Sequence, residues 1–424
     1  MKRLELLARA FAGAAMISLT ACSGSTSAMP HVSQPIPSHG TVGSPNTVPA
    51  HVMTLDVYDN SGTGFTPNPV SAAPHLTWAA LQPADANAFA AAGIKTILYT
   101  DPNRTAPGDP LYTNDETTFA HDCSNNRITI PGKPTTTYLM DPSSPDLQAL
   151  WRTYVANVFS WGDHFDAVFE DNAGIAHPVS TLPCNFDQTA WTAASNAMNQ
   201  AVGASIMYNG LGNLASGIQN VSPAIGLNPT AIAGELEGCY SNGDPLDPMP
   251  HKTVWQTYET TEIAMVAAGK PFVCRGLGTL PASTSQTERM YMYASFLLTY
   301  DPNTAIISEK FATHAPMMVD PESQFVALDP LVPEPALITD LQSANLTFGR
   351  QYADCYLNGV AVGACAAVVN ADNSKASHPF PWPGVYQHTL VLHGGAISDG
   401  GWAGWHGAPP PAVLPGESAV IAIQ

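Results

Sequence analysis

Residues 137–172 read TYLMDPSSPDLQALWRTYVANVFSWGDHFDAVFEDN. A short apolar run is followed by a segment that opens with Ser144-Pro145, and a second apolar run then ends in acidic residues. Proline is favoured in the first turn of a helix, because the amide that it lacks would have no partner there. Apolar residues between Leu147 and Val158 recur at the spacing of one helical face. The stretch therefore predicts a strand, a helix and a second strand.

The same unit recurs along most of the chain. Helix signals separate the β-prone runs, such as Gln82-Pro83 and the capping box formed by Ser285 and Glu288. The eight predicted strands are 53–58, 95–100, 137–140, 167–169, 205–208, 231–236, 271–274 and 305–308. This α/β alternation predicts a (β/α)8 TIM barrel over 51–340. An open doubly wound sheet remains the alternative, although no Gly-rich phosphate loop follows the first predicted strand.

After residue 340 the pattern changes to short strands separated by turns. The predicted strands are 351–356, 366–370, 388–393 and 419–423. Asn358-Gly359 is typical of a tight hairpin turn. We therefore expect a small C-terminal all-β sandwich domain over 345–424. Trp402 and Trp405 lie in a Gly-rich segment of it, where they would either stack on a sugar or pack within the sandwich.

The N-terminal residues predict export. An apolar run too short to span a bilayer ends at Leu19-Thr20-Ala21-Cys22. These four residues resemble a bacterial lipobox, which implies a signal peptide over 1–21 and a lipid anchor on Cys22. An ordinary signal peptide with a chance cysteine is the alternative. Residues 23–50 contain no charged side chain, so 22–50 are expected to form a flexible tether. The predicted location is the cell envelope, at the outer membrane in a Gram-negative cell, or outside the cell.

The balance of charges disfavours several classes of partner. Fifteen Lys and Arg against 34 Asp and Glu give a net charge of -19. This sign disfavours nucleic acid and anionic membrane surfaces and is compatible with a neutral polymer such as a polysaccharide. Membrane contact is expected only through the lipid anchor. We expect a monomer that uses no cofactor. We also expect no metal, since no Cys or His spacing typical of a zinc site occurs.

Six cysteines besides Cys22 predict three disulfides in an oxidising compartment. They are Cys123, Cys184, Cys239, Cys274, Cys355 and Cys365. Their order along the chain does not determine the pairing. A two-residue turn at Asn358-Gly359 would set Cys355 opposite Val362. A bridge between the two cysteines of this hairpin therefore requires a bulge, for which Gly363 is the candidate.

Polar residues, most of them acidic, close the predicted strands. In a barrel the C-terminal ends of the strands carry the reacting groups. In chain order the candidates are Asp56, Tyr58, Asp101, Arg104, Asp141, Glu170, Asp171, Asn172, Tyr208, Asn209, Glu235, Glu237, Arg275 and Glu309. Carboxylates at one rim with few lysines suit acid and base chemistry on a neutral substrate. For Asp101, Arg104 and Asp141, loop capping or surface ion pairing is an equally good interpretation.

Several motifs together resemble barrel glycoside hydrolases, most closely a GHL15-like group. The segments YLMDPSSP at 138–145 and FDAVFEDN at 165–172 are similar to the family wording "DPSNP, helix, FDGVFLDN". GELEG at 234–238 is similar to the family's sixth strand, and RQY at 350–352 with AAVVN at 366–370 resembles its appended β domain. The resemblance covers nearly all of the mature chain. It implies hydrolysis of glycosidic bonds in a polysaccharide or oligosaccharide.

Matching these motifs residue by residue assigns roles to two carboxylates. Asp171 falls on the acidic residue that closes the fourth strand, as nucleophile or general base, and Glu237 on the acid that closes the sixth. A strand alternates its faces, so Glu170 and Asp171 cannot both point inward, and the family wording favours Asp171. The family has an apolar residue where Glu170 stands. Glu235 is expected to pair with Arg275.

A second hypothesis belongs to a different class. The chain would then be a non-catalytic carbohydrate-binding or envelope-assembly lipoprotein on the same barrel, because fold does not guarantee function. Two inward carboxyl groups about 5 to 9.5 Å apart would favour hydrolysis.

Overall fold

The computed structural model describes residues 49–58, 68–131, 135–162, 164–173, 183–212, 221–240, 252–276, 285–308, 319–344, 346–397 and 400–424. The predicted signal peptide, Cys22, nearly all of the predicted tether, and Glu309 lie outside these residues.

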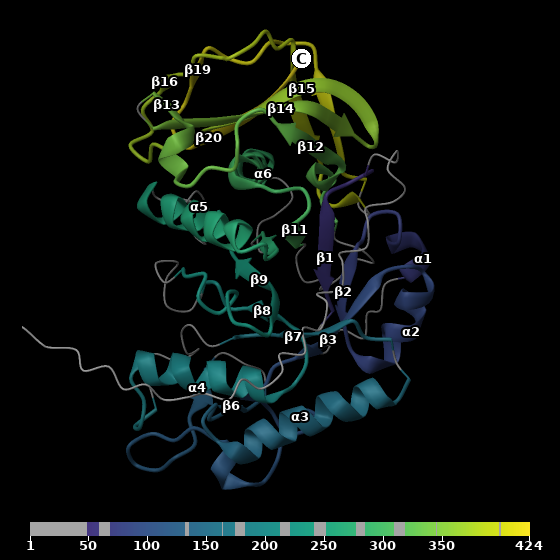
Figure 1. The fold of residues 1–424 in the computed structure, drawn as a ribbon, viewed down its shortest axis with the longest axis vertical. Coiled ribbons are helices and arrows are strands. Elements are labelled where there is room, and N and C mark those ends of the chain that lie inside the picture. The colour runs from purple at the N-terminus through teal and green to yellow at the C-terminus, as the bar shows by residue number, and fades with distance from the viewer. Residues whose placement is uncertain are drawn as a thin grey trace, which may run out of the picture. The chain divides into compact units, whose positions relative to one another are not determined.

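Eight parallel strands close into a barrel, which confirms the predicted fold class (Figure 1). Around the barrel the strands are β1 (Met53–Val57), β11 (Ala305–Ser308), β10 (Phe272–Arg275), β9 (Ala231–Glu237), β8 (Ile206–Asn209), β7 (Ala167–Glu170), β3 (Lys95–Thr100) and β2 (Trp78–Leu81). Strand β1 pairs in parallel with both β11 and β2, so the sheet has no free edge. The open doubly wound alternative is therefore wrong.

One predicted barrel strand is wrong. Residues 137–140 contribute β6 (Thr137–Leu139), which pairs antiparallel with β4 (Arg104–Thr105) and β5 (Thr129–Ile130) in a separate small sheet. The second barrel strand is β2, which the sequence analysis missed. The strand at 95–100 is therefore the third, and the sheet of β4, β5 and β6 is an insertion after it.

Helices begin where the local signals predict them. Helix α2 (Pro83–Ala91) starts at the predicted proline, and α6 (Ser285–Thr299) starts at the predicted serine. In α3 (Pro145–Ser160) the Ser144 hydroxyl accepts a hydrogen bond from the Leu147 amide at 3.3 Å. The other described helices are α1 (Pro69–Ala72), α4 (Gln188–Ala201) and α5 (Lys252–Ala267), with 3-10 turns at Glu116–Thr118, Pro321–Gln324 and Ile338–Leu341.

The barrel interior is packed with apolar side chains, and their positions show which way each strand faces. The buried inward residues are Leu55, Val57, Ala80, Ile97, Ala167, Phe169, Met207, Ala233, Val273 and Ile306. Residues next to them in sequence, such as Leu98 and Val168, belong to the outer core between strands and helices. Alternation then predicts the direction of each polar residue at the strand ends.

An antiparallel sheet forms the C-terminal part of the chain, as predicted. Its strands follow the order β12 (Phe325–Pro330), β14 (Thr347–Leu357), β15 (Val360–Asn370), β20 (Ser418–Ile423), β17 (His388–His393) and β18 (Trp402–His406), with β13 (Gln342–Ala344) beside β14. A two-stranded sheet of β16 (His378–Pro379) and β19 (Val413–Leu414) accompanies it. Strand β12 precedes residue 340, so this sheet takes one strand from before the predicted domain boundary.

The hairpin of β14 and β15 contains the expected bulge. Asn358 and Gly359 both have positive φ, at 52° and 73°. Cys355 is paired with Gly363 instead of Val362, and Gly363 has φ 87°. The shifted register brings Cys355 to a Cα separation of 6.0 Å from Cys365, and the two form a disulfide.

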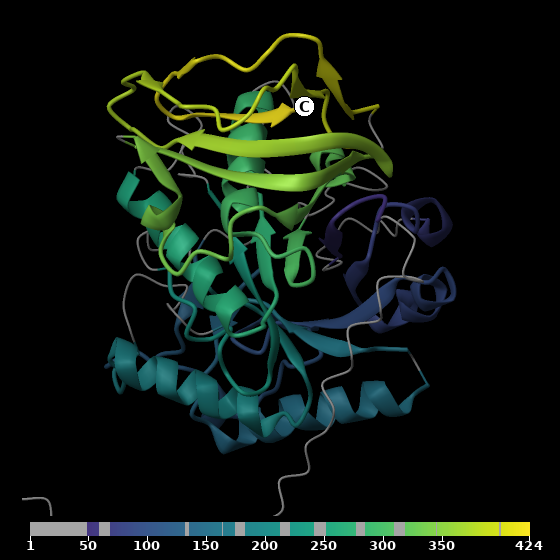
Figure 2. The same cartoon turned by 45° about the horizontal axis from the view of Figure 1, so that its top comes forward.

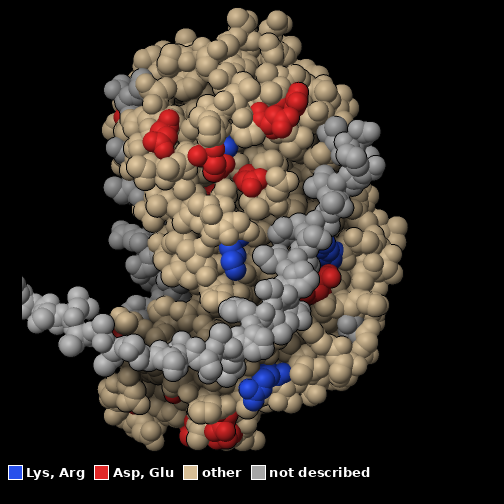
Figure 3. Space-filling view, viewed as in Figure 1, with Lys and Arg blue, Asp and Glu red and all other residues tan. Residues whose placement is uncertain are grey.

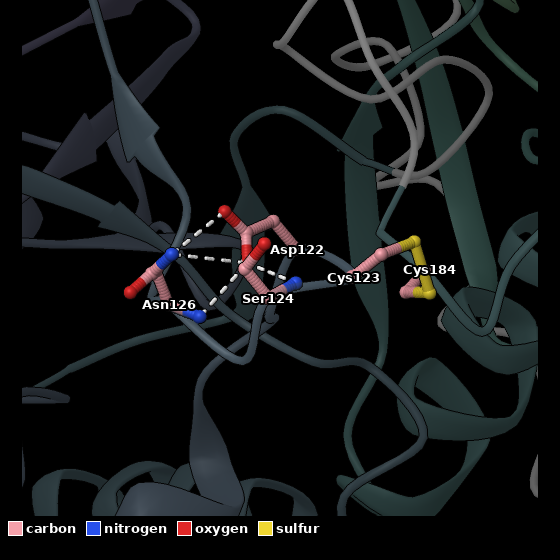
Figure 4. Close-up of a disulfide and its surroundings, with 5 residues drawn as sticks. All are labelled: Asp122, Cys123, Ser124, Asn126 and Cys184. Carbon is pink, nitrogen blue, oxygen red and sulfur yellow. Dashed lines mark hydrogen bonds between the residues drawn. A yellow bond between two sulfur atoms is a disulfide. The ribbon is translucent and has the colours of Figure 1, made fainter.

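Two further disulfides complete the three that the cysteine count predicts. Cys239 and Cys274 join β9 to β10 with a Cα separation of 5.2 Å. Cys123 and Cys184 tie the insertion after β3 to the segment before α4, at 4.8 Å (Figure 4). Beside this bridge the Asp122 carboxylate accepts a hydrogen bond from the Asn126 amide at 2.8 Å. Disulfides are typical of oxidising compartments.

Arg350 fastens the C-terminal sheet to the barrel. Figure 2 shows this sheet lying across α6. The buried guanidinium of Arg350 donates to the carbonyls of Leu298 and Tyr300 at 3.2 and 2.8 Å, and to Glu334 at 2.7 Å. Carbonyls at a helix C-terminus have no partner within the helix and carry partial negative charge, so a cation there is stabilising.

Two buried glutamates lie on α5 near the end of α6. Glu259 accepts a hydrogen bond from the Thr299 hydroxyl at 2.9 Å, and Glu262 accepts one from the Tyr240 hydroxyl at 2.8 Å. Burial raises the pKa of both carboxyl groups well above the usual range, and the positive charge of Arg350 only partly opposes this. Both side chains therefore keep a proton to higher pH than exposed glutamates do.

We predict that Glu259→Gln stabilises the protein at neutral pH. In the unfolded chain this carboxyl group ionises near pH ~4.3. In the folded chain it keeps its proton to higher pH. The folded state then binds more protons, so the free energy of unfolding falls as pH rises through this window. Urea unfolding from pH 4.5 to 8 should show a flatter pH dependence in the variant, with a gain of roughly 1 kcal/mol or more at the upper end.

Glu322→Gln is the matched control for this experiment. Glu322 is equally buried but forms an ion pair with Arg289. Its replacement should lower stability, because the arginine then loses a charged partner. A Glu259→Gln variant that is less stable than the parent at pH 8 would contradict the interpretation.

Candidate functional site

Asp171 lies at the centre of a hydrogen-bonded group at the C-terminal end of the barrel. It follows β7, shares the inward face of Phe169, and is 9% exposed. Oδ2 accepts a hydrogen bond from the Tyr99 hydroxyl at 2.6 Å. Oδ1 accepts from the Asn209 side-chain amide at 2.8 Å and from the Asn172 backbone amide at 2.9 Å. These donors orient the carboxylate and stabilise its charge.

The Asn209 amide links Asp171 to Glu237. Its Nδ2 is 2.8 Å from Asp171 Oδ1 and 3.3 Å from Glu237 Oε2. Asp171 Oδ1 and Glu237 Oε2 both lie close to this nitrogen, so the distance between these two oxygens cannot exceed the sum of the two distances. Asn209 is buried and Glu237 is partly exposed. The two residues to which the sequence assigns catalysis thus lie together, Asp171 directly after β7 and Glu237 at the end of β9.

A buried ion pair lies deeper in the barrel than Glu237. Glu235 is the inward-facing residue that precedes Glu237 on β9. Arg275 Nη1 and Glu235 Oε1 are 2.8 Å apart, with side chains 1% and 0% exposed, which is the pairing expected from the sequence. Burial raises the pKa of Glu235 to about 7; Arg275 opposes this shift, while Glu237 and Asp171 add to it. The charge of Arg275 also acts on Glu237 and Asp171.

Asp101 and Asn172 extend the group toward β3. Asn172 has φ 56°, a left-handed conformation that asparagine tolerates. Its side-chain amide donates to Asp101 Oδ2 at 2.8 Å, and the Arg104 backbone amide donates to Oδ1 at 3.0 Å. Burial raises the pKa of Asp101 to about 7, Arg104 lowers it and Asp171 raises it. Asp101 therefore ties the loop after β3 to the turn after β7.

Glu170 points away from this group, as the alternation of the strand predicts. Its side chain is fully buried outside the barrel interior, where Asn103 Nδ2 donates to Oε1 at 3.0 Å. Burial raises its pKa well above the usual range, opposed by the hydrogen bond from Asn103. Glu170 therefore keeps its proton to higher pH than an exposed glutamate does.

Two candidates near the first strand require correction. Asp56 lies between the inward residues Leu55 and Val57 in sequence, so it faces outward, and it is fully buried. Its Oδ1 accepts a hydrogen bond from the Val57 amide at 2.9 Å. Tyr58 packs in an outer apolar cluster, with its ring centroid 5.8 Å from that of Phe89. Neither residue joins the group around Asp171.

Two other candidates also have structural surroundings. Tyr208 is fully buried in the outer core, and its hydroxyl hydrogen-bonds to that of Thr230. Asp141 follows the insertion strand β6, and its Oδ1 accepts hydrogen bonds from the Ser143 amide at 2.8 Å and hydroxyl at 2.6 Å. Asp141 thus has the loop-capping role that the sequence left open. Glu309 lies outside the described residues.

Tyr99 is a member of the group that the sequence analysis missed. Its ring stacks on Phe169 inside the barrel, with centroids 5.8 Å apart. The available signal was alternation: Tyr99 is two residues after the inward Ile97 and two before Asp101. Asn103, the partner of Glu170, is one of the polar residues that follow the same strand.

The backbones after β7 and β8 touch beside the site. The Ala173 amide donates to the Asn209 carbonyl at 2.8 Å. A Cβ added at Gly210 would lie 2.1 Å from the Ala173 carbonyl oxygen, so this position has no room for a side chain. The contact fixes the distance between the strand ends that carry Asp171 and Asn209.

We predict that Gly210→Ala destabilises the protein by about 1–3 kcal/mol, because a backbone segment must move to relieve the overlap. Gly407→Ala is the control, since the nearest atom to its added Cβ is 4.0 Å away. Urea unfolding of both variants measures the difference. Equal stabilities would show that the two loops separate at no cost.

The remaining features of the described residues concern metal ligands, membrane-spanning helices and surface cations. No group of three or more His, Cys, Asp or Glu among them is arranged to hold a metal ion. None of the helices in the described ranges has both the length and the apolar character needed to cross a membrane. On the face seen in Figure 3, Lys and Arg side chains are few and lie apart from one another.

Comparison with known proteins finds similarity at the level of solved structures. No family model matches the sequence, so the GHL15-like assignment stays a prediction, and no curated protein matches it. The glycoside hydrolase domain of PelA from Pseudomonas aeruginosa is 14% identical with a TM-score of 0.40, over 60% of this chain and 94% of that domain.

Two further similar structures are those of an α-galactosidase and of a protein solved with galactosamine. The GH36 α-galactosidase AgaA from Geobacillus stearothermophilus is 9% identical with a TM-score of 0.42; the match covers 88% of this chain and only 56% of that protein. Ega3 from Aspergillus fumigatus, solved with galactosamine, is 12% identical with a TM-score of 0.37, over 62% of this chain and 92% of that one. The barrel itself is established by the strand pairing described above.

Proposed function

We propose that this protein is an exported glycoside hydrolase that cleaves a neutral polysaccharide or oligosaccharide with Asp171 and Glu237. The observation that carries the proposal is the shared hydrogen bonding of both carboxylates to Asn209 on the inward face of the barrel end. Reacting groups of (β/α)8 enzymes lie at this end. Two carboxyl groups that flank one bond are what glycoside hydrolysis requires.

The separation of the two carboxylates favours a double-displacement mechanism. One amide nitrogen lies 2.8 Å from Asp171 Oδ1 and 3.3 Å from Glu237 Oε2, an arrangement compatible with the roughly 5–5.5 Å separation of carboxyl groups in retaining pairs. Asp171 would attack the anomeric carbon while Glu237 gives its proton to the leaving oxygen. Glu237 would then take a proton from the water that attacks the glycosyl-enzyme ester and releases Asp171.

Neighbouring side chains would prepare Asp171 for attack. The hydrogen bonds from Tyr99 and Asn209 hold the carboxylate in one orientation, so little reorganisation precedes the reaction. The guanidinium of Arg275, paired with Glu235, places a positive charge beside Asp171 and Glu237. Asp101, Arg104 and Asn172, on the β3 side of Asp171, are the proposed contacts for sugar hydroxyls.

Export and anchoring belong to the same proposal. Three disulfides fit an oxidising compartment, and the N-terminal sequence supplies a signal peptide. We infer that acylated Cys22 and the tether up to residue 50 hold the enzyme at the cell envelope, and that the protein acts as a monomer on polymer outside the cell.

We predict that Asp171→Asn reduces turnover by roughly 10³-fold or more, because the amide cannot act as nucleophile. Glu170→Gln is the matched control at the adjacent position, and it should keep activity within a few-fold. Reducing-sugar release from a panel of neutral polysaccharides, by protein starting at Ser23, is the measurement. The reverse pattern would make Glu170 the working carboxylate, and inactivity of the parent on every polymer would favour the non-catalytic interpretation.

The stereochemistry of the product supplies an independent test. Proton NMR of a digest, recorded before the product mutarotates, should first show the anomer with the configuration of the substrate. A double displacement through Asp171 requires retention. Initial formation of the opposite anomer would show that water attacks directly and that Asp171 acts as a base.

A further inference from the structure

We propose that Trp402 forms a second carbohydrate-binding site, on the C-terminal sheet and separate from the carboxylates of the barrel. The ligand is a pyranose ring of a neutral glycan, and the indole face is the binding surface. The site does not depend on the proposed hydrolysis, because none of its residues belongs to the group around Asp171.

One face of the indole is covered and the other is open. Trp402 and His393 are paired across β18 and β17, and their rings stack with centroids 3.9 Å apart and planes inclined by 24°. Trp402 nevertheless stays 50% exposed. Since the imidazole covers one face of the indole, the exposed area lies mainly on the opposite face.

Gly404 leaves room for one edge of the indole beside the strand. A Cβ added at Gly404 would lie 2.6 Å from Cζ3 of Trp402, so the ring occupies the space that a side chain would fill. Gly404 is two residues after Trp402 and therefore lies on the same face of the strand. The ring is thus oriented before a ligand arrives, which lowers the entropic cost of binding.

The surroundings of the indole suit an uncharged sugar. The same face carries Val391, paired with Gly404, and Thr389, paired with His406. The Thr389 hydroxyl and the His406 ring nitrogen are 3.4 Å apart and can hydrogen-bond sugar hydroxyls. Strands β17 and β18, HTLVLH and WAGWH, contain no Asp, Glu, Lys or Arg.

The chemistry of a pyranose ring matches this surface. Its axial hydrogens form an apolar face with slight positive charge, which the negative face of an indole attracts, while its hydroxyls lie at the rim. An acidic glycan would meet a protein of net charge -19 without any cation on these strands. The observations therefore favour a neutral glycan.

Trp405 offers a matched control on the same strand. It is 49% exposed, similar to Trp402, but it is paired with the buried Leu390 and lies on the opposite face. The two tryptophans therefore do not form one platform, nor does either of them pack fully within the sheet.

Affinity electrophoresis of the full chain tests the proposal. Native gels are cast with galactomannan, hydroxyethyl cellulose, arabinoxylan or glycogen, and all proteins carry Asp171→Asn so that the polymer stays intact. At least one polymer should retard the parent. Trp402→Ala should weaken that affinity about tenfold or more, because the apolar contact is lost, whereas Trp405→Ala should stay within about twofold of the parent.

A second variant separates loss of the platform from loss of the fold. Gly404→Ala keeps Trp402 but displaces the edge of its ring from the space beside the strand, so it should weaken binding at an unchanged midpoint of thermal unfolding. Retardation of the parent by none of the four polymers would overturn the proposal. Equal losses from Trp402→Ala and Trp405→Ala, or full binding by the Trp402 variant, would also overturn it.

Discussion

The guanidinium of Arg275 is the charge on which the carboxylate-rich end of the barrel depends. It is buried against Glu235 at 2.8 Å and also acts on Glu237 and Asp171. Like charges repel strongly where water is excluded, so these carboxylates could not all ionise without a cation. Burial raises the pKa of Glu235 to about 7, the charge of Arg275 opposes this shift, and the charges of Glu237 and Asp171 add to it. The positive charge of Arg275 is therefore what lets these carboxyl groups share one end of the barrel.

The sequence predicts most of the group around Asp171 because strand ends share one rim of a barrel. Asn209, Glu237 and Arg275 follow from this rule and from the alternation of each strand. This rule does not identify Tyr99, because the tyrosine lies within its strand and reaches the rim only through its long side chain. Tyr208 was assigned wrongly because the rule does not say which face of a strand a residue occupies. That face is determined by the apolar residues that fill the interior, and these were identified only from the closed barrel.

Elements that depend on local sequence signals could be predicted. Strands whose place depends on their pairing partners in the folded chain could not. Trp78–Leu81 is short, rich in alanine and ends directly before a helix, so its pattern is weak; its two parallel neighbours make it a barrel strand. Thr137–Leu139 has a strong strand pattern, but it belongs to the insertion after β3, where it pairs with β4 and β5. The bulge at Gly363 followed from turn geometry within one hairpin. The other disulfides join cysteines 61 and 35 residues apart, and only the folded chain brings these together.

Glu170 shows how a departure from the family wording is compatible with the same fold. The predicted family resemblance implies an apolar residue at this position, and here a glutamate faces the buried outer side of β7. A glutamate can occupy such a position if it keeps its proton, which its raised pKa allows. In that form it offers a donor as well as an acceptor, and Asn103 next to it supplies an amide for the acceptor. Oδ1 of Asn103 and Oε2 of Glu170 have no hydrogen-bond partner among the described residues. The neutral pair therefore replaces an apolar contact behind the strand and leaves the inward face to Asp171.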